Sequence, residues 1–183
     1  MRVIAGRLGG RRLSAPRGRL TRPTSERVRE AVFAMLAGVE GARVLDLFAG
    51  SGALGIEALS RGASCAVFVE RDARAARVLR ANLAALGLSP GEAEVRHDDA
   101  LHAVQSARRS KETYDLLFID PPYRQARDWG TELSTELPSL LAPGARIVVE
   151  SDRRAPLRLQ GSVERERRYG DTSITIHRHD DPS

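Results

Sequence analysis

The segment Asp120-Pro121-Pro122-Tyr123 is the clearest candidate for a reacting centre. It follows an apolar run that predicts a buried strand, and the ligands of open α/β sheets bind beyond the carboxyl ends of strands. Because proline has no N–H, the backbone here offers acceptors: the Asp120 carboxylate and the Pro121 carbonyl. Two acceptors can hold the hydrogens of a nucleobase amine while Tyr123 stacks on the ring. This pattern favours methyl transfer to an exocyclic amine, with catalysis by positioning and the base single-stranded or flipped out.

A glycine-rich segment, Gly50-Ser51-Gly52-Ala53-Leu54-Gly55, has the spacing of a nucleotide-binding loop between a strand and a helix. Glu70 ends the next expected strand, where a carboxylate can bind two ribose hydroxyls. These features fit both NAD and S-adenosylmethionine. Asp46, just before the loop, favours S-adenosylmethionine, because a carboxylate would repel a pyrophosphate and attract a sulfonium or ammonium group. A purely structural strand-to-helix turn is the competing interpretation.

The segment His97-Asp98-Asp99-Ala100 closes a short third strand and is open to two interpretations. Asp99 could accept a hydrogen bond from an adenine amino group, or Asp98 or Asp99 could cap the following helix. The four histidines show no metal-ligand spacing with carboxylates or with Cys65, so no metal site is expected.

The elements that must position these residues alternate between short apolar runs and helical patterns. We expect strands at 43–48, 65–70, 93–96, 114–120 and 145–150, and helices at 25–37, 53–60, 72–86, 99–107 and 128–141. Such alternation predicts an α/β fold with a mostly parallel sheet covered on both faces. Two further runs, 163–168 and 172–177, have no helix between them and predict a C-terminal antiparallel hairpin.

Positive charge is concentrated at the N-terminus. The net charge of the chain is +5, yet residues 1–30 hold nine arginines and only two acidic residues. Glycines and prolines interrupt residues 1–24, which predict a small basic hairpin or arm followed by a loop. A local positive field attracts polyanions, although a solvated arm would have the same composition. We therefore divide the chain into the arm at 1–24, a main domain at 25–178 and a frayed tail at 179–183.

Composition excludes several classes of protein. The chain has 183 residues, of which 42% are hydrophobic, enough for one folded domain. Its single cysteine excludes a disulfide framework and a cysteine-based zinc site. No apolar run approaches the roughly 20 residues of a membrane helix, and the N-terminus does not have the pattern of a signal peptide. A cytoplasmic protein without membrane contact is expected.

The residues also resemble a known family. Residues 46–63, which read DLFAGSGALGIEALSRGA, and the Asp120–Tyr123 segment are similar to the RsmD family, class I methyltransferases that modify a guanine N2 in 16S ribosomal RNA. Residues 22–33, which read RPTSERVREAVF, and residues 149–151, which read VES, agree with it. The resemblance covers nearly the whole chain and implies the Rossmann-like class I fold and action on a partly assembled 30S subunit. We also expect the protein to be a monomer.

The resemblance assigns roles to individual positions. It implies that guanine is held by Asp120, Pro121, Pro122 and Tyr123. It implies that S-adenosylmethionine is bound by Thr24, Asp46, Phe48, Gly50, Ser51, Gly52, Glu70, Arg71, Asp99 and Ala100. It implies that RNA is bound by Arg2, Arg7, Arg11, Arg12, Arg22, Arg27 and Arg29.

Other functions remain open from the sequence. An adenine-N6 or cytosine-N4 methyltransferase of DNA or RNA could use the same acceptors, although reading duplex DNA needs an element for which this chain has little room. An RNA-binding assembly module with a vestigial pocket would bind no cofactor. A nicotinamide oxidoreductase would need a hydride-site residue and a substrate domain that the sequence does not offer.

Overall fold

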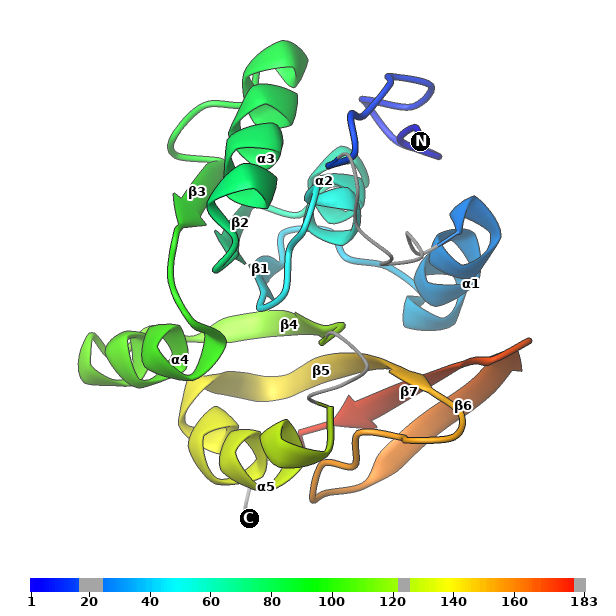
Figure 1. The fold of residues 1–183 in the computed structure, drawn as a ribbon, viewed down its shortest axis with the longest axis vertical. Coiled ribbons are helices and arrows are strands. Elements are labelled where there is room, and N and C mark those ends of the chain that lie inside the picture. The colour runs from blue at the N-terminus through cyan, green and yellow to red at the C-terminus, as the bar shows by residue number, and fades with distance from the viewer. Residues whose placement is uncertain (17–24, 122–125, 180–183) are drawn as a thin grey trace.

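A single mixed sheet organises the protein (Figure 1). The computed structural model describes residues 1–16, 25–121 and 126–179, and within them the sheet has seven strands. Their order is β3-β2-β1-β4-β5-β7-β6, in which β1 to β5 pair in parallel and β7 pairs antiparallel with β5 and β6. This confirms the expected parallel sheet and C-terminal hairpin. The strands are β1 Arg43–Asp46, β2 Cys65–Val69, β3 Ala93–Arg96, β4 Tyr114–Ile119, β5 Leu141–Asp152, β6 Val163–Tyr169 and β7 Thr172–Arg178.

Helices connect the parallel strands, and local sequence signals fix their ends. The helices are α1 Glu26–Leu36, α2 Ala53–Ser60, α3 Ala73–Leu86, α4 Ala100–Arg109 and α5 Ala126–Glu136. Asp72 caps α3 by accepting from the backbone N–H groups of Arg74 and Ala75, and Gly87 ends that helix in the left-handed conformation. Both features are typical of helix termini.

Apolar side chains form a core on each face of the sheet. On one face, α1, α2 and α3 pack against alternate residues of the strands, including Phe68 and Phe118. On the other, α4 and α5 pack against the intervening residues, including Leu45 and Leu117. Figure 1 shows the two sets of helices on opposite sides of β4 and β5. This is the doubly covered arrangement that near-continuous apolar strands require.

The largest difference from expectation lies around Pro138. The helix expected at 128–141 is α5, which already begins at Ala126, followed by a 3-10 turn at Leu137–Leu140. Because proline cannot donate the backbone hydrogen bond of an α-helix interior, the α-helix ends before Pro138 and a tighter 3-10 turn follows. Strand β5 then starts at Leu141, earlier than the Ala145 expected, and Gly144 adopts a φ of +74° within it.

The described part of the N-terminal arm, residues 1–16, packs onto α2 and α3. The expected hairpin reduces to one antiparallel bridge between Arg2 and Arg12. Its apolar residues Val3, Leu8 and Leu13 are buried in the same core as α1 and α2. The basic arm is therefore joined to the main domain by packing rather than tethered loosely to it.

Across the described ranges, every helix falls short of the length and hydrophobicity that crossing a bilayer requires.

Candidate active site

The acidic residues singled out from the sequence meet at the carboxyl edge of the sheet. Strand β1 ends at Asp46, which is paired in register with Phe68 of β2 and Phe118 of β4. Glu70 and Asp120 each follow two residues beyond those phenylalanines, so all three acids occupy neighbouring strand ends. This is where parallel α/β sheets bind their ligands.

The glycine loop between β1 and α2 is held in place by backbone hydrogen bonds. The N–H of Leu47 donates to Phe118 of β4, and the N–H of Ala49 donates to Val69 of β2, at 3.0 Å each. Gly50 and Gly52 have φ angles of +57° and +84°, a region that disfavours side chains. A Cβ at Gly52 would come within 2.3 Å of Leu79, whereas one at Gly50 would meet nothing within 4 Å. Gly52 is thus required for packing, and open space adjoins Gly50.

Glu70 joins the glycine loop to the end of β2. Its carboxylate accepts from the backbone N–H of Gly50 at 2.8 Å and from that of Asp72 at 2.7 Å. The side chain is largely buried. These bonds fix the carboxylate beside the loop, which is the position that recognition of a ribose requires; the ribose contact itself stays a prediction.

Asp46 lies beneath the loop rather than on its surface. Its carboxylate accepts from the N–H of Gly55, in the first turn of α2, at 3.2 Å, and the residue is 2% exposed. Burial raises the pKa of Asp46 to about 7, and the hydrogen bond from Gly55 only partly opposes that shift. A carboxyl group with a pKa near 7 would lose its proton readily when a cationic ligand binds beside it.

The residues that follow β3 form the N-terminal cap of helix α4. Asp99 is the N-cap of α4, and its side chain accepts from the N–H of Leu101 at 3.0 Å. Asp98 instead accepts from His102 at 2.7 Å. Of the two interpretations left open by the sequence, the capping role of Asp99 is confirmed, and a contact with adenine is not tested. Ala100 is buried behind the cap.

Three further expected cofactor residues, Phe48, Ser51 and Arg71, lie in or near the loop and have different surroundings. Phe48 packs edge-to-face on Trp129 of α5, with ring centroids 5.5 Å apart. Arg71 is exposed, and its carbonyl lies 3.1 Å from Nε2 of His97. Ser51 is buried, and its carbonyl accepts from the Asn82 side chain.

The expected catalytic segment is described in part. Asp120 is half-buried directly after β4, and Pro121 is buried. Parallel pairing of Ile119 with Val149 places these residues next to the end of β5, where Glu150 is buried. Pro122 and Tyr123, like Arg22 and Thr24, lie outside the described residues, so their expected roles stay predictions.

Five of the arginines expected to bind RNA lie at the surface. Arg2 pairs with Glu26, Arg7 pairs with Glu92, and Arg11 donates to the carbonyl of Ala85. Arg12 and Arg27 are also exposed. All five remain accessible to a polyanion, because surface pairs of this kind are weak.

The expectation for Arg29 is wrong. Its side chain is 0% exposed, donates to the carbonyl of Arg2 and lies 3.7 Å from the carboxylate of Glu57. A fully buried guanidinium cannot contact RNA. Arg29 is instead part of the core between α1, α2 and the arm.

Glu57 is the residue that sequence reasoning missed. Its carboxylate accepts from the backbone N–H groups of Ile4 and Ala5, at 2.7 and 3.0 Å, and from Arg61. It thereby fixes the basic arm against α2. The available signal was its position as the one charged residue in the otherwise apolar α2 sequence ALGIEALS.

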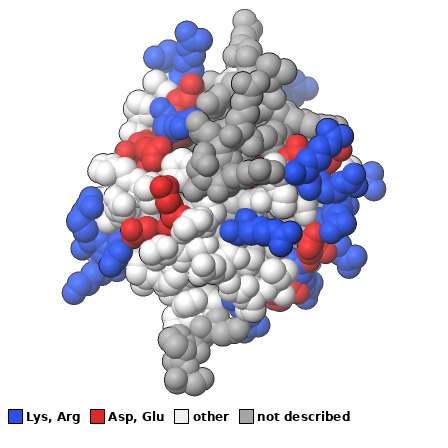
Figure 2. Space-filling model, turned by 60° about the horizontal axis from the view of Figure 1, so that its bottom comes forward, with Lys and Arg blue, Asp and Glu red and all other residues white. Residues whose placement is uncertain are grey.

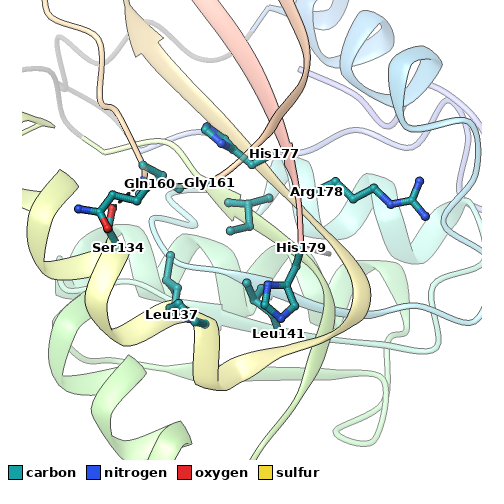
Figure 3. A pocket seen from close by; sticks show the side chains of 11 residues that line it. Ser134, Leu137, Leu141, Gln160, Gly161, His177, Arg178 and His179 are labelled. Atoms are coloured by element: carbon teal, nitrogen blue, oxygen red, sulfur yellow. Dashed lines mark hydrogen bonds between the residues drawn. The ribbon is translucent and has the colours of Figure 1, made fainter. Parts of the chain in front are cut away.

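A small pocket elsewhere in the molecule has no part in this site (Figure 3). It encloses about 70 Å³ between α5, the start of β5 and residues 159–161. Its lining is mostly apolar, and it lies toward the amino end of β5, away from Asp120. Within the described residues, no cluster of His, Cys, Asp and Glu could hold a metal ion.

Comparisons with known proteins agree with this architecture. A family described as "Conserved hypothetical protein 95" matches residues 1–178. Ribosomal RNA small subunit methyltransferase D of Escherichia coli (strain K12) is 42% identical over 154 residues, which span 83% of this chain and 75% of that protein. The structure of the Escherichia coli protein yhhF has a TM-score of 0.82 at 36% identity and covers 98% of each chain.

A more distant likeness concerns the fold alone. The RNA methyltransferase from Salinibacter ruber, solved in complex with S-adenosyl-L-homocysteine, has a TM-score of 0.66 at 17% identity. The match covers 88% of this chain and 95% of that one.

Proposed function

This chain belongs to the RsmD family, and from that premise we propose that it transfers a methyl group from S-adenosylmethionine to the N2 amine of a guanine in small-subunit ribosomal RNA. Its fold is the class I methyltransferase fold that the sequence predicts. The observation that carries the proposal is the position of Asp120 and Pro121, at the end of β4 beside the glycine loop. Acceptors for an amine thus adjoin the region suited to the methyl donor.

The glycine loop suits S-adenosylmethionine better than a dinucleotide. The N–H of Gly50 donates to Glu70, and the N–H of Gly52 donates to the carbonyl of Ala49. Neither N–H is therefore free to bind a pyrophosphate, as dinucleotide loops require. The buried Asp46 carboxyl favours a cationic ligand, and open space adjoins the backbone of Gly50.

Asp120 and Pro121 act on the base. When bound, S-adenosylmethionine supplies an electrophilic methyl group on a sulfonium sulfur. The Asp120 carboxylate and the Pro121 carbonyl accept the two amine hydrogens and turn the nitrogen lone pair toward that methyl. As the N–C bond forms and the C–S bond breaks, the nitrogen becomes acidic, and its proton passes to Asp120 or to water.

The exposed arginines of the arm bind the RNA backbone. Arg2, Arg7, Arg11 and Arg12 lie on a segment that Glu57 holds against α2. Phosphate contacts of this kind position a nucleic acid without reading its sequence. We expect the protein to act as a monomer in the cytoplasm, where its substrate assembles.

Labelled methyl transfer tests this function. The substrates are 30S subunits from a strain lacking the protein, naked 16S ribosomal RNA and duplex DNA; subunits from the parent strain are the control. We expect labelled methyl groups to be incorporated into 30S subunits from the strain lacking the protein but not into subunits from the parent strain. Digestion of the labelled RNA to nucleosides should yield N2-methylguanosine. Methyl groups on adenine, cytosine or duplex DNA would contradict the proposal.

A further inference from the structure

A second basic region, distinct from the arm, lines a groove near the C-terminal hairpin. The groove has a volume of about 300 Å³ and lies between residues 153–159 and the strands β6 and β7. Arg153, Arg158 and Arg168 line it, against a single carboxylate, Glu166. An open groove with this excess of arginine suits an anion.

The groove begins at the same edge of the sheet as the candidate active site. Strand β5 lies beside β4, so its carboxyl end adjoins Asp120. The antiparallel partner of Asp152 is Thr172, and the N–H of Arg153 donates to the carbonyl of Asp171 in the hairpin turn. Arg153 and the tip of the β6–β7 hairpin are therefore neighbours of the catalytic edge.

The arginines of the groove are available to a ligand. Within the described ranges, the side chains of Arg153 and Arg158 make no ion pair or hydrogen bond. Arg168 pairs with Glu166 at 3.2 Å, but its side chain is 66% exposed. Since exposed pairs contribute little, a phosphate could compete for Arg168. Figure 2 shows basic side chains on the right of the molecule, interspersed with acidic ones, and further basic side chains on the left.

Protection of the sheet edge does not explain all of these charges. Strand β6 is an edge strand, and charged residues on such strands prevent pairing with other chains. That reason covers Arg168 and its neighbours in the sequence VERERRY. It does not cover Arg153 and Arg158, which lie in the connection before the hairpin and outside any strand pairing with β6.

We propose that this groove holds phosphates of the RNA strand that flanks the target nucleotide. The inference rests on the proposed function, because it takes the base to be at Asp120. The arm lies on α2 and α3 and the groove at the far end of the strand order, so the two basic regions would hold RNA on opposite sides of the active site. Two separated anchors would fix the path of the strand and leave the base between them free to enter the pocket.

Charge reversal in the groove tests the proposal. The double variant Arg153→Glu/Arg158→Glu is compared with the control Arg109→Glu/Lys111→Glu, which makes the same charge change at the amino edge of the sheet. We expect the groove variant to raise the KM for 30S subunits lacking the modification by about tenfold or more, and to weaken filter binding of naked 16S ribosomal RNA. Its salt slope for binding should fall by about 0.7 log unit per lost contact. The kcat and the affinity for S-adenosylhomocysteine should stay unchanged, and the control should resemble the wild type.

The outcomes separate this inference from the proposed function. A groove variant with the KM and salt slope of the wild type would contradict the proposal that the groove binds RNA phosphates, and would leave the proposed function unaffected. A variant weakened on 30S subunits but not on naked 16S ribosomal RNA would assign the groove to a ribosomal protein, which also overturns it. Absence of methyl transfer by the wild type would refute the function itself, while filter binding of the same RNA still tests the groove. The variant Arg153→Gln/Arg158→Gln removes both positive charges without adding negative ones, so it tests the groove if the charge-reversal variant fails to fold.

Discussion

The guanidinium of Arg29 lies 3.7 Å from the carboxylate of Glu57, and both side chains are completely buried. Desolvation lowers the pKa of Arg29, and the Glu57 charge opposes that shift. The same carboxylate accepts from the backbone of Ile4 and Ala5. One buried acid therefore neutralises a core arginine and holds the basic arm in place.

Replacing Glu57 by glutamine should destabilise the protein by about 3–5 kcal/mol, because it leaves a buried charge without its partner. Urea denaturation measures the free energy of unfolding. Glu30→Gln, an exposed position on α1, is the control and should change it by less than about 0.5 kcal/mol. An effect of Glu57→Gln as small as that of the control would show that the pair does not hold the arm.

The docking of the arm can be tested at two glycines. Gly6 and Gly10 have nearly equal φ angles, +78° and +81°. A Cβ at Gly6 would lie 1.8 Å from the carbonyl oxygen of Ser60, whereas one at Gly10 would meet nothing within 4 Å. Gly10→Ala should cost about 1 kcal/mol for its backbone conformation alone, and Gly6→Ala should cost clearly more. Equal melting temperatures for the two variants would contradict the docked arm.

Binding of the cofactor should release a proton from Asp46. Its pKa of about 7 means that the neutral form is well populated below neutral pH, whereas a cationic ligand favours the carboxylate. Affinity for S-adenosylmethionine should therefore rise between pH 6 and pH 8. Calorimetry at pH 6.5 in two buffers of different ionisation enthalpy measures the released proton. Asp46→Asn should bind more weakly and lose this pH dependence; an unchanged profile would separate Asp46 from the cofactor.

His177 should make stability depend on pH. Burial lowers its pKa below the usual value of 6.5, and Nδ1 has no partner among the described residues. Since the unfolded chain takes up the proton more readily, the contribution of His177 is present above pH 6.5 and is lost as the pH falls below it. His177→Phe should flatten the change in unfolding free energy between pH 7.5 and pH 5.5. Parallel curves for variant and wild type would rule this out.

Much of the fold could be predicted because its signals are local. Asp72 and Gly87 mark the two ends of α3, and the glycine loop marks the turn from β1 to α2. The spacing of Asp46, Glu70 and Asp120 also follows from the sequence, because each comes at the end of an apolar run. Parallel strands then bring such residues to one edge.

The role of the buried charges could not be predicted because it depends on distant contacts. The arginine content of residues 1–30 does not say which side chains face solvent. Arg29 shares the buried face of α1 with Val32 and Phe33, so helical spacing indicates burial of its side chain but not its partner. Its partner Glu57 lies on another helix, and an i,i+4 pair with Arg61 looks like an ordinary surface pair. Only the packing of α1, α2 and the arm reveals the cluster.

The most direct test of the account is the turnover of Asp120→Ala on 30S subunits lacking the modification, measured beside its affinity for S-adenosylhomocysteine. If Asp120 acts on the base, the variant loses most of its methyl transfer activity but binds S-adenosylhomocysteine with the affinity of the wild type. Asp120→Asn, which keeps an acceptor oxygen, retains some activity. Turnover near the wild-type rate in Asp120→Ala would contradict the assignment of the reacting centre.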